Sequence, residues 1–163
     1  MYFLLLIYLL KIYLRKDIKS THRKVSPIQQ SKIVPPALKT GDKIGIISTA
    51  RKICLEELMP ALNILKSWGL NPVLGEHLLE EHHQFSGTDI QRASDLQHMI
   101  DEPDIKAVLC ARGGYGTVKI IDKVDFSKLL KNPKWIAGYS DVTVLHSHLN
   151  KLGISSIHCS MPI

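Results

Sequence analysis

The sequence predicts an α/β domain in which a parallel sheet carries helices on both faces. Three observations support this prediction. Short apolar runs of strand length recur along the chain, segments with helical spacing of apolar residues lie between them, and turn residues separate the two. The length of 163 residues suits one domain of ordinary size.

The alternation begins at residue 42. Residues 42–50, DKIGIISTA, predict a first buried strand. Residues 54–68 place apolar side chains at helical spacing, and Gly69 follows as a stop signal. Residues 70–75, LNPVLG, predict a short second strand.

A helix over residues 89–101 follows a polar connection, and Thr88 or Asp89 is suited to cap its first turn. The periodicity predicts that this helix buries Ala93, Leu96, Met99 and Ile100.

The second half continues the alternation. Strands are predicted over 106–111 (KAVLCA), 135–139 and 154–158, and helices over 117–124 and 141–151. The expected fold is therefore flavodoxin-like or Rossmann-like. In such sheets ligands bind beyond the carboxyl ends of the strands, so the residues just after each strand are the candidates for function.

Residues 1–34 are predicted to be an apolar and basic leader with a linker, and residues 35–163 the folded domain. The apolar run at residues 1–14 would reach about 21 Å as a helix, short of the ~30 Å hydrocarbon core. Two interpretations stay open. The run contacts a membrane peripherally, with the basic cluster holding the domain on the cytoplasmic side, or it is an upstream extension with no role in the fold.

The net charge of +6 is carried by residues 1–33, which hold seven basic side chains and one acidic one. The remainder is neutral and lacks the basic excess that nucleic-acid binding requires, so no nucleic-acid partner is expected. Cys54, Cys110 and Cys159 are odd in number and widely spaced, which predicts reduced thiols in a reducing, cytoplasmic compartment.

The stretch ARGGYG follows the predicted strand 106–111. Gly113, Gly114 and Gly116 permit positive φ and close backbone approach, so their N–H groups are able to face an anion or a developing oxyanion. A common glycine turn explains them equally, and they match no dinucleotide motif. Arg112 has a guanidinium suited to a carboxylate ligand, or it pairs with a neighbouring acid and holds the loop.

The stretch GYSDVT follows the predicted strand 135–139. Ser140 lies between a strand and a helix, as in a nucleophile elbow, where the N–H of Asp141 would stabilise an oxyanion. Val142 stands where that motif has its second glycine. The alternative is that Ser140 or Asp141 simply caps the helix.

These motifs resemble the N-terminal half of the LD-carboxypeptidase family, which contains muramoyl-tetrapeptide carboxypeptidases and microcin self-immunity peptidases. The resemblance rests on FSGTDIQRASDLQHMIDEPDIKAVLCARGGYG, WIAGYSDVTVLHSHL and IHCSMP, in this order, and extends from Pro35 to the last residue. It implies hydrolysis of the L,D-peptide bond to the terminal D-alanine of a cytoplasmic murein tetrapeptide, in wall recycling or in antibiotic-peptide immunity. It implies no metal or cofactor.

The resemblance also implies the roles of individual residues. Ser140 is the expected nucleophile of a Ser-Glu-His triad, and the N–H groups of Asp141 and Gly114 form the expected oxyanion hole. From their place in the ARGGYG stretch, and apart from the resemblance, Arg112, Gly113 and Tyr115 are the expected substrate-binding residues.

In the family the Glu and His come from a C-terminal domain, and we expect that domain to lie beyond these 163 residues. We therefore expect the 163-residue chain to be inactive or nearly so, because a serine without a base is a weak nucleophile. His158 is the local histidine considered as a substitute. A cluster of His77, His82 and His83 is interpreted as solvated surface rather than a zinc site.

Two alternatives to an active peptidase remain. The chain is a non-catalytic module that binds muropeptide, or it is one half of a split peptidase. The apolar surface left by a missing domain would then be covered by the C-terminal half or by a second copy in a homodimer.

Overall fold

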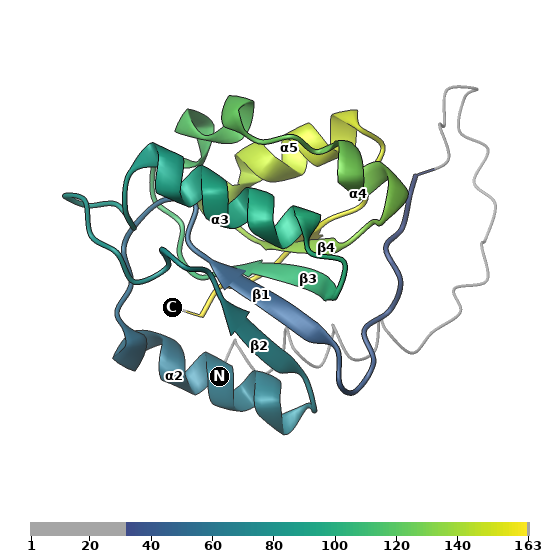
Figure 1. Ribbon diagram of the computed structural model, residues 1–163, viewed down its shortest axis with the longest axis horizontal. Helices are drawn as coiled ribbons and strands as arrows, with labels where there is room; N and C mark the ends of the chain where they lie inside the picture. Colours follow the sequence, from purple (N-terminus) through teal and green to yellow (C-terminus); the bar gives the residue numbers. More distant parts are fainter. Residues whose placement is uncertain (1–31, 163) are drawn as a thin grey trace.

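The computed structural model describes residues 32–162 as a five-stranded parallel sheet with helices on both faces (Figure 1). The spatial order is β2-β1-β3-β4-β5, which is the flavodoxin-like order. This confirms the predicted fold class. The strands are β1 (Lys43–Ile47), β2 (Asn71–Leu74), β3 (Ile105–Cys110), β4 (Trp135–Gly138) and β5 (Ile157–His158).

Two apolar cores lie on the two faces of the sheet. One packs α2 (Leu55–Ser67) against β1, β3 and β4, with Leu58 and Leu62 from the helix. The other packs α3 (Asp89–Asp101) and α5 (Thr143–Lys151) against the opposite face, together with Leu129 of α4 (Ser127–Lys131). Figure 1 shows α2 below the sheet and the other three helices above it.

The helix predicted over 89–101 is confirmed with the same bounds. The hydroxyl of Thr88 accepts from the N–H of Gln91 at 3.3 Å, while the Gln91 side chain accepts from the N–H of Thr88 at 2.8 Å, so the two form a capping box. Its predicted core residues Ala93, Leu96, Met99 and Ile100 are all buried. The helix over 54–68 is likewise found as α2, and Gly69 ends it with φ of +76°.

The segment after β3 differs from the expectation. Instead of an α-helix over 117–124 there are two single 3₁₀ turns, η1 (Thr117–Lys119) and η2 (Ile121–Lys123). Four of these eight residues are isoleucine or valine, and β-branched side chains disfavour a continuous helix. The prediction also missed α4, which begins where the carboxylate of Asp125 accepts from the N–H and hydroxyl of Ser127.

The last strand is shorter than predicted. Only Ile157 and His158 pair with β4, and Ile154 forms a separate bridge with Ile33, a residue predicted to belong to the leader. The N–H of Ile33 donates to the carbonyl of Gly153, and the carbonyl of Ile33 accepts from the N–H of Ser155, both at 2.8 Å. The chain therefore contacts the sheet edge before residue 35.

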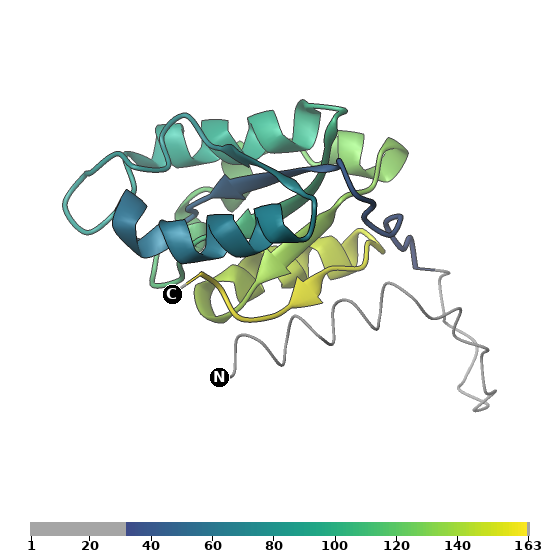
Figure 2. The same cartoon turned by 90° about the horizontal axis from the view of Figure 1, so that it is seen from below.

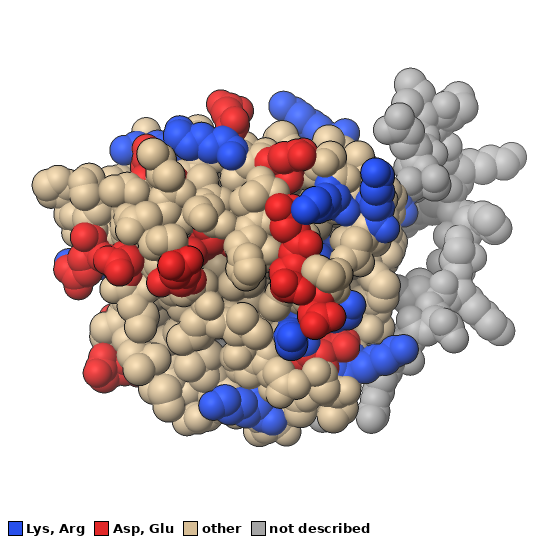
Figure 3. Space-filling view, viewed as in Figure 1, with Lys and Arg blue, Asp and Glu red and all other residues tan. Residues whose placement is uncertain are grey.

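Residues 1–31, which contain most of the predicted leader and its proposed membrane contact at 1–14, lie outside the described residues. Within residues 32–162 no helix is both long and apolar enough to cross a membrane. On the face shown in Figure 3, acidic and basic side chains are interspersed.

Lys134 lies buried at the amino end of β4, with only 1 % of its surface exposed. Pro103 has no N–H, so it leaves the carbonyl of Met99 without its usual partner four residues ahead in α3. The ammonium of Lys134 donates to that carbonyl at 2.8 Å and also to the carbonyl of Glu102. A lysine before β4 thereby completes the end of a helix on a different part of the chain.

Candidate active site

The candidate site lies at the carboxyl edge of the sheet, where the loops after β1, β3, β4 and β5 come together. The described chain also ends at this edge, on the side to which β1 points in Figures 1 and 2. The backbone N–H of Arg51, after β1, donates to the carbonyl of Gly113, after β3, at 3.4 Å. The parallel sheet thus gathers segments that are far apart in the sequence.

Ser140 occupies a sharp corner between β4 and the helical segment η3 (Ser140–Val142) that leads into α5. Its φ is +60°, in the left-handed region that costs a residue with a side chain about 1–2 kcal/mol. The residue is exposed. Ser140 thus lies at a corner between a strand and a helical segment, as the sequence predicted, and the positive φ adds strain at this corner.

The corner is tight because Gly138 packs closely against its neighbours. A Cβ on Gly138 would lie 3.0 Å from both γ-carbons of Val142 and 3.2 Å from Cβ of Cys110. A larger residue at position 138 would require Val142 and Cys110 to shift by a few tenths of an ångström, so the glycine suits this close approach of the helical segment to the strand.

Gly113 lies directly against Ser140. A Cβ added there would be 3.3 Å from Cβ and 3.5 Å from Oγ of Ser140, and 3.1 Å from Cε of Met161. A side chain at position 113 would therefore press on Cβ of Ser140 and on Met161, and it would touch the serine hydroxyl. The glycine turn after β3 and the corner after β4, predicted separately from the sequence, form one site.

Free backbone donors are concentrated at this site. Within residues 32–162, the N–H groups of Gly113, Gly114, Tyr115 and Asp141 donate to no carbonyl or side chain. Three of these residues belong to the turn that contacts Ser140, and Asp141 follows it. Free N–H groups of this kind are the donors that an oxyanion hole uses.

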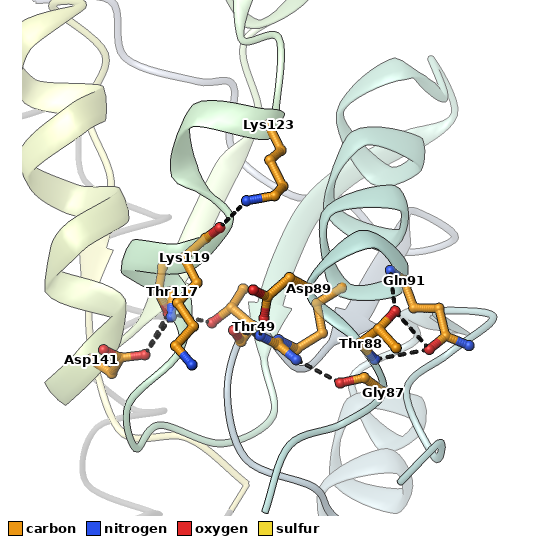
Figure 4. Close-up of polar contacts among 10 residues, drawn as sticks. Thr49, Gly87, Thr88, Asp89, Gln91, Thr117, Lys119, Lys123 and Asp141 are labelled. Carbon is orange, nitrogen blue, oxygen red and sulfur yellow. Dashed lines mark hydrogen bonds and ion pairs between the residues drawn. The ribbon is translucent and has the colours of Figure 1, made fainter. Parts of the chain in front are cut away.

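The carboxylate of Asp141 caps neither η3 nor α5, the helical segments at and after Ser140. It accepts from the N–H of Thr117 at 2.8 Å and from its hydroxyl at 2.7 Å (Figure 4). The hydroxyl of Thr117 also lies 2.8 Å from that of Thr49, and both threonines are fully buried. The capping alternative is thus not what the structure contains, because Asp141 joins the serine corner to the end of the glycine turn.

Arg112 has partners within the protein. Its guanidinium donates to the carbonyl of Lys52 at 3.1 Å and lies 3.5 Å from the carboxylate of Glu57. These contacts are those of the loop-holding alternative. Tyr115 is 59 % exposed, and the ammonium of Lys119 lies 5.4 Å from the centre of its ring.

The nearby histidines are not hydrogen-bonded to Ser140. Nε2 of His146 lies 3.0 Å from the carbonyl of Gly138 and must donate to it, so Nδ1 accepts from Ser156 at 2.9 Å. Burial lowers the pKa of His146 below its ordinary value. His158 is exposed, and its ring centre lies 5.7 Å from that of His146.

The other predicted features lie elsewhere. His77 bonds through Nδ1 to the buried carboxylate of Asp95 at 2.9 Å, while the rings of His82 and His83 contact each other edge to face. Within residues 32–162, no group of three or more His, Cys, Asp or Glu side chains is arranged to hold a metal ion.

Two thiols lie below the site. Burial raises the pKa of Cys110 to about 12 and that of Cys159 to about 11. Both stay protonated at neutral pH, so neither supplies the thiolate that a cysteine nucleophile needs. Cys54 is exposed, in contrast to the other two.

Arg51, Thr49 and Thr117 were not among the predicted site residues. All three follow β1 or β3 at the carboxyl edge, which is the position that the fold class marks for inspection. None of the three belongs to a recognisable sequence motif, and they come close to the serine corner only in the folded chain.

The fold and the site together define an α/β protein of the flavodoxin-like sheet order, with a strained serine beside a glycine turn at the carboxyl edge. Residues 44–159 match the family model described as the LD-carboxypeptidase N-terminal domain. The chain belongs to this family, as the resemblance predicted.

Relatives and a solved structure agree with this membership. A probable murein peptide carboxypeptidase of Bacillus subtilis is 40% identical over 128 residues, covering 78% of this chain and 40% of its own length. The murein tetrapeptide carboxypeptidase of Pseudomonas aeruginosa is 34% identical over 117 residues, which cover 71% of this chain and 38% of that relative.

The crystal structure of an MccF-like protein from Bacillus anthracis superposes with a TM-score of 0.74 at 27% identity, covering 80% of this chain and 41% of that one. The chain thus spans about two-fifths of the length of the proteins that it matches.

Proposed function

We propose that this chain is the nucleophile-bearing half of a serine LD-carboxypeptidase that releases the terminal D-alanine of murein tetrapeptides. The observation that carries the proposal is the geometry of Ser140. Its φ of +60° holds the residue at an exposed corner, against a glycine turn whose N–H groups are free within the described residues. The names of the relatives supply the substrate class.

The proposed chemistry is acyl transfer through Ser140. Its Oγ attacks the carbonyl carbon of the last peptide bond, and a histidine base takes the hydroxyl proton. The N–H groups of Asp141 and Gly114 donate to the oxyanion that forms on the carbonyl oxygen. The C–N bond then breaks, the amino group of D-alanine leaves with that proton, and water hydrolyses the acyl-serine.

The base and its carboxylate partner are proposed to come from the part of the family fold that follows the matched region. Two observations support this. His146 has both ring nitrogens engaged, and within residues 32–162 no histidine is hydrogen-bonded to Ser140. The chain also covers about two-fifths of its relatives. We therefore expect the 163-residue chain to release little or no D-alanine by itself.

The test compares the chain alone with a fusion protein. In the fusion protein, this chain through Cys159 is joined to the part of the Pseudomonas aeruginosa relative that follows its matched region. We expect the fusion protein to release D-alanine from tetrapeptide, and Ser140→Ala to reduce that rate by a factor of about 10⁴ or more. Release is measured by chromatography of the free amino acid.

His158→Ala in the fusion protein is the control, because it removes the exposed local histidine that was considered as a substitute base, while the proposed base comes from the added part. It is expected to keep most of the activity. Equal rates for the fusion protein and its Ser140→Ala variant would refute Ser140 as the nucleophile. Serine-dependent release by the 163-residue chain alone would refute the need for an added base.

A further inference from the structure

Arg51 is a cation at the site without a partner. It is exposed, and within residues 32–162 its guanidinium makes no ion pair and no hydrogen bond. Other cations of this edge have partners. Arg92 binds Asp89 and the carbonyls of Thr49 and Gly87. Lys52 pairs with Glu81 at 2.6 Å.

The position of Arg51 is fixed by its backbone. Its N–H donates to the carbonyl of Gly113 at 3.4 Å, its carbonyl accepts from the hydroxyl of Ser48, and it forms an antiparallel bridge with Phe85. These three contacts fix the backbone of Arg51, so its guanidinium can reach only the region around this point of the sheet edge.

The side chain of Arg51 lies over Gly114. A Cβ on Gly114 would be 2.6 Å from Cγ, 3.0 Å from Cδ and 3.2 Å from Nε of Arg51. Gly113 precedes Gly114 in the chain, and its own Cβ would lie 3.5 Å from Oγ of Ser140. Arg51, the glycine turn and the serine are therefore consecutive neighbours in space.

The substrate of a carboxypeptidase has a negative charge close to the bond that is cleaved. Its terminal carboxylate belongs to the residue just beyond that bond, and neighbouring Cα atoms are about 3.8 Å apart. A group that binds the carboxylate must therefore lie beside the nucleophile and the oxyanion donors. A guanidinium matches a carboxylate with two parallel hydrogen bonds.

We propose that Arg51 binds the terminal carboxylate of the peptide and so restricts cleavage to the last bond. The inference rests on the proposed function, because it assumes that a peptide is cleaved at Ser140. It transfers to Arg51 the role that the sequence suggested for Arg112, whose guanidinium contacts Lys52 and Glu57. Besides donating its N–H to the oxyanion, Gly114 must lack a side chain, because a Cβ there would displace Arg51.

The test measures binding of one tetrapeptide in two forms, with a free terminal carboxylate and with a terminal amide. Calorimetry with the full 163-residue chain carrying Ser140→Ala keeps the peptide intact. We expect the acid to bind about tenfold or more tightly than the amide. Arg51→Gln should lower the affinity for the acid to that for the amide and leave the amide unchanged, and Arg51→Lys should retain part of the preference.

Lys52→Gln is the matched control, because it removes one positive charge from the adjacent side chain, which pairs with Glu81. It should keep the full preference for the acid. Circular dichroism and thermal unfolding establish that each variant is folded.

Three results would overturn the inference. An Arg51→Gln variant that still prefers the acid as strongly as its parent overturns it and leaves the proposed function standing. Equal binding of the acid and the amide by the parent, the chain carrying Ser140→Ala, also overturns the inference and leaves the proposed function standing. A parent that binds neither form, with a fusion protein that releases no D-alanine, overturns the proposed function and the inference together.

Discussion

The two ends of β4 show opposite uses of polar groups. At its amino end, Lys134 is buried and donates to the carbonyls of Met99 and Glu102. At its carboxyl end, Ser140 is exposed, lies at φ +60°, and its hydroxyl bonds to nothing within residues 32–162. One strand of four residues separates the two.

The difference shows where this fold uses polar groups for stability and where it leaves them free. The ammonium of Lys134 replaces an N–H that Pro103 lacks, so removing it should affect stability. The corner at Ser140 contains strain and free donors, so changing it should affect ligand chemistry while leaving stability unchanged or higher. The following predictions test this contrast.

Lys134→Met should have the largest effect on stability. It leaves the buried carbonyl of Met99 without a donor, and an unsatisfied buried group costs about 1–3 kcal/mol. Denaturant unfolding at neutral pH measures the loss. Lys131→Met, at an exposed lysine of α4, is the control and should change the free energy of unfolding little. Equal stability of the two variants would mean that Lys134 does not support α3.

Lys134 should also make a contribution to stability that grows with pH in the alkaline range. Burial lowers the pKa of Lys134 from 10.5 to about 8. Between these values the folded chain has released a proton from Lys134 that the unfolded chain still binds, so this group alone increases the free energy of unfolding as pH rises from about 8 to about 10.5. The buried thiols of Cys110 and Cys159 act in the opposite direction above about pH 9, because their pKa values are raised from 9.0. The free energy of unfolding of the parent minus that of Lys134→Met should therefore increase from about pH 8 to about 10.5, and a difference that stays constant would contradict the assignment.

Thr117→Val should weaken the site and also lower stability by about 1 kcal/mol, less than Lys134→Met. The valine keeps the N–H that donates to Asp141, but it loses the hydroxyl contact at 2.7 Å and leaves the buried hydroxyl of Thr49 without its partner at 2.8 Å. We expect about a tenfold lower rate of D-alanine release in the fusion protein, because the glycine turn and the serine corner lose one of their links. Thr117→Ser, which restores the hydroxyl, should recover most of the rate. A rate unchanged in Thr117→Val would show that the backbone hydrogen bond suffices.

Ser140→Gly should have the smallest effect and the opposite sign. Glycine adopts φ +60° without a Cβ penalty, so the free energy of unfolding should increase by up to about 1 kcal/mol. Ser140→Ala keeps the Cβ and should show no such gain. Thermal and denaturant unfolding of both variants give the comparison. If Ser140→Gly is no more stable than Ser140→Ala, the corner is not strained.

The local elements were predictable because their signals are local. The spacing in α3 and its Thr88 cap lie within a few residues, and both were found as expected. The helix predicted over 117–124 was wrong because β-branched residues break it into two 3₁₀ turns. Ile33 beside Ile154 could not be predicted, since their pairing joins segments from opposite ends of the described chain.

The candidate site divides in the same way. Ser140 and the glycine turn carry a readable motif, and their contact follows from the parallel sheet. Arg51 over Gly114 and the bond from Thr117 to Asp141 join loops that lie 24 residues or more apart. Such contacts are made by tertiary structure, and composition or periodicity does not contain them.

The bond between Lys134 and Met99 also bears on the order in which the chain is assembled. The two residues are 35 apart, so α3 is synthesised before its last turn receives its missing donor. On the ribosome, the carbonyl of Met99 therefore stays without this donor until Lys134 has been synthesised and β4 can pack. In hydrogen-exchange experiments on the folding chain, we expect amides in the last turn of α3 to gain protection together with those of β4, later than amides near its capped first turn.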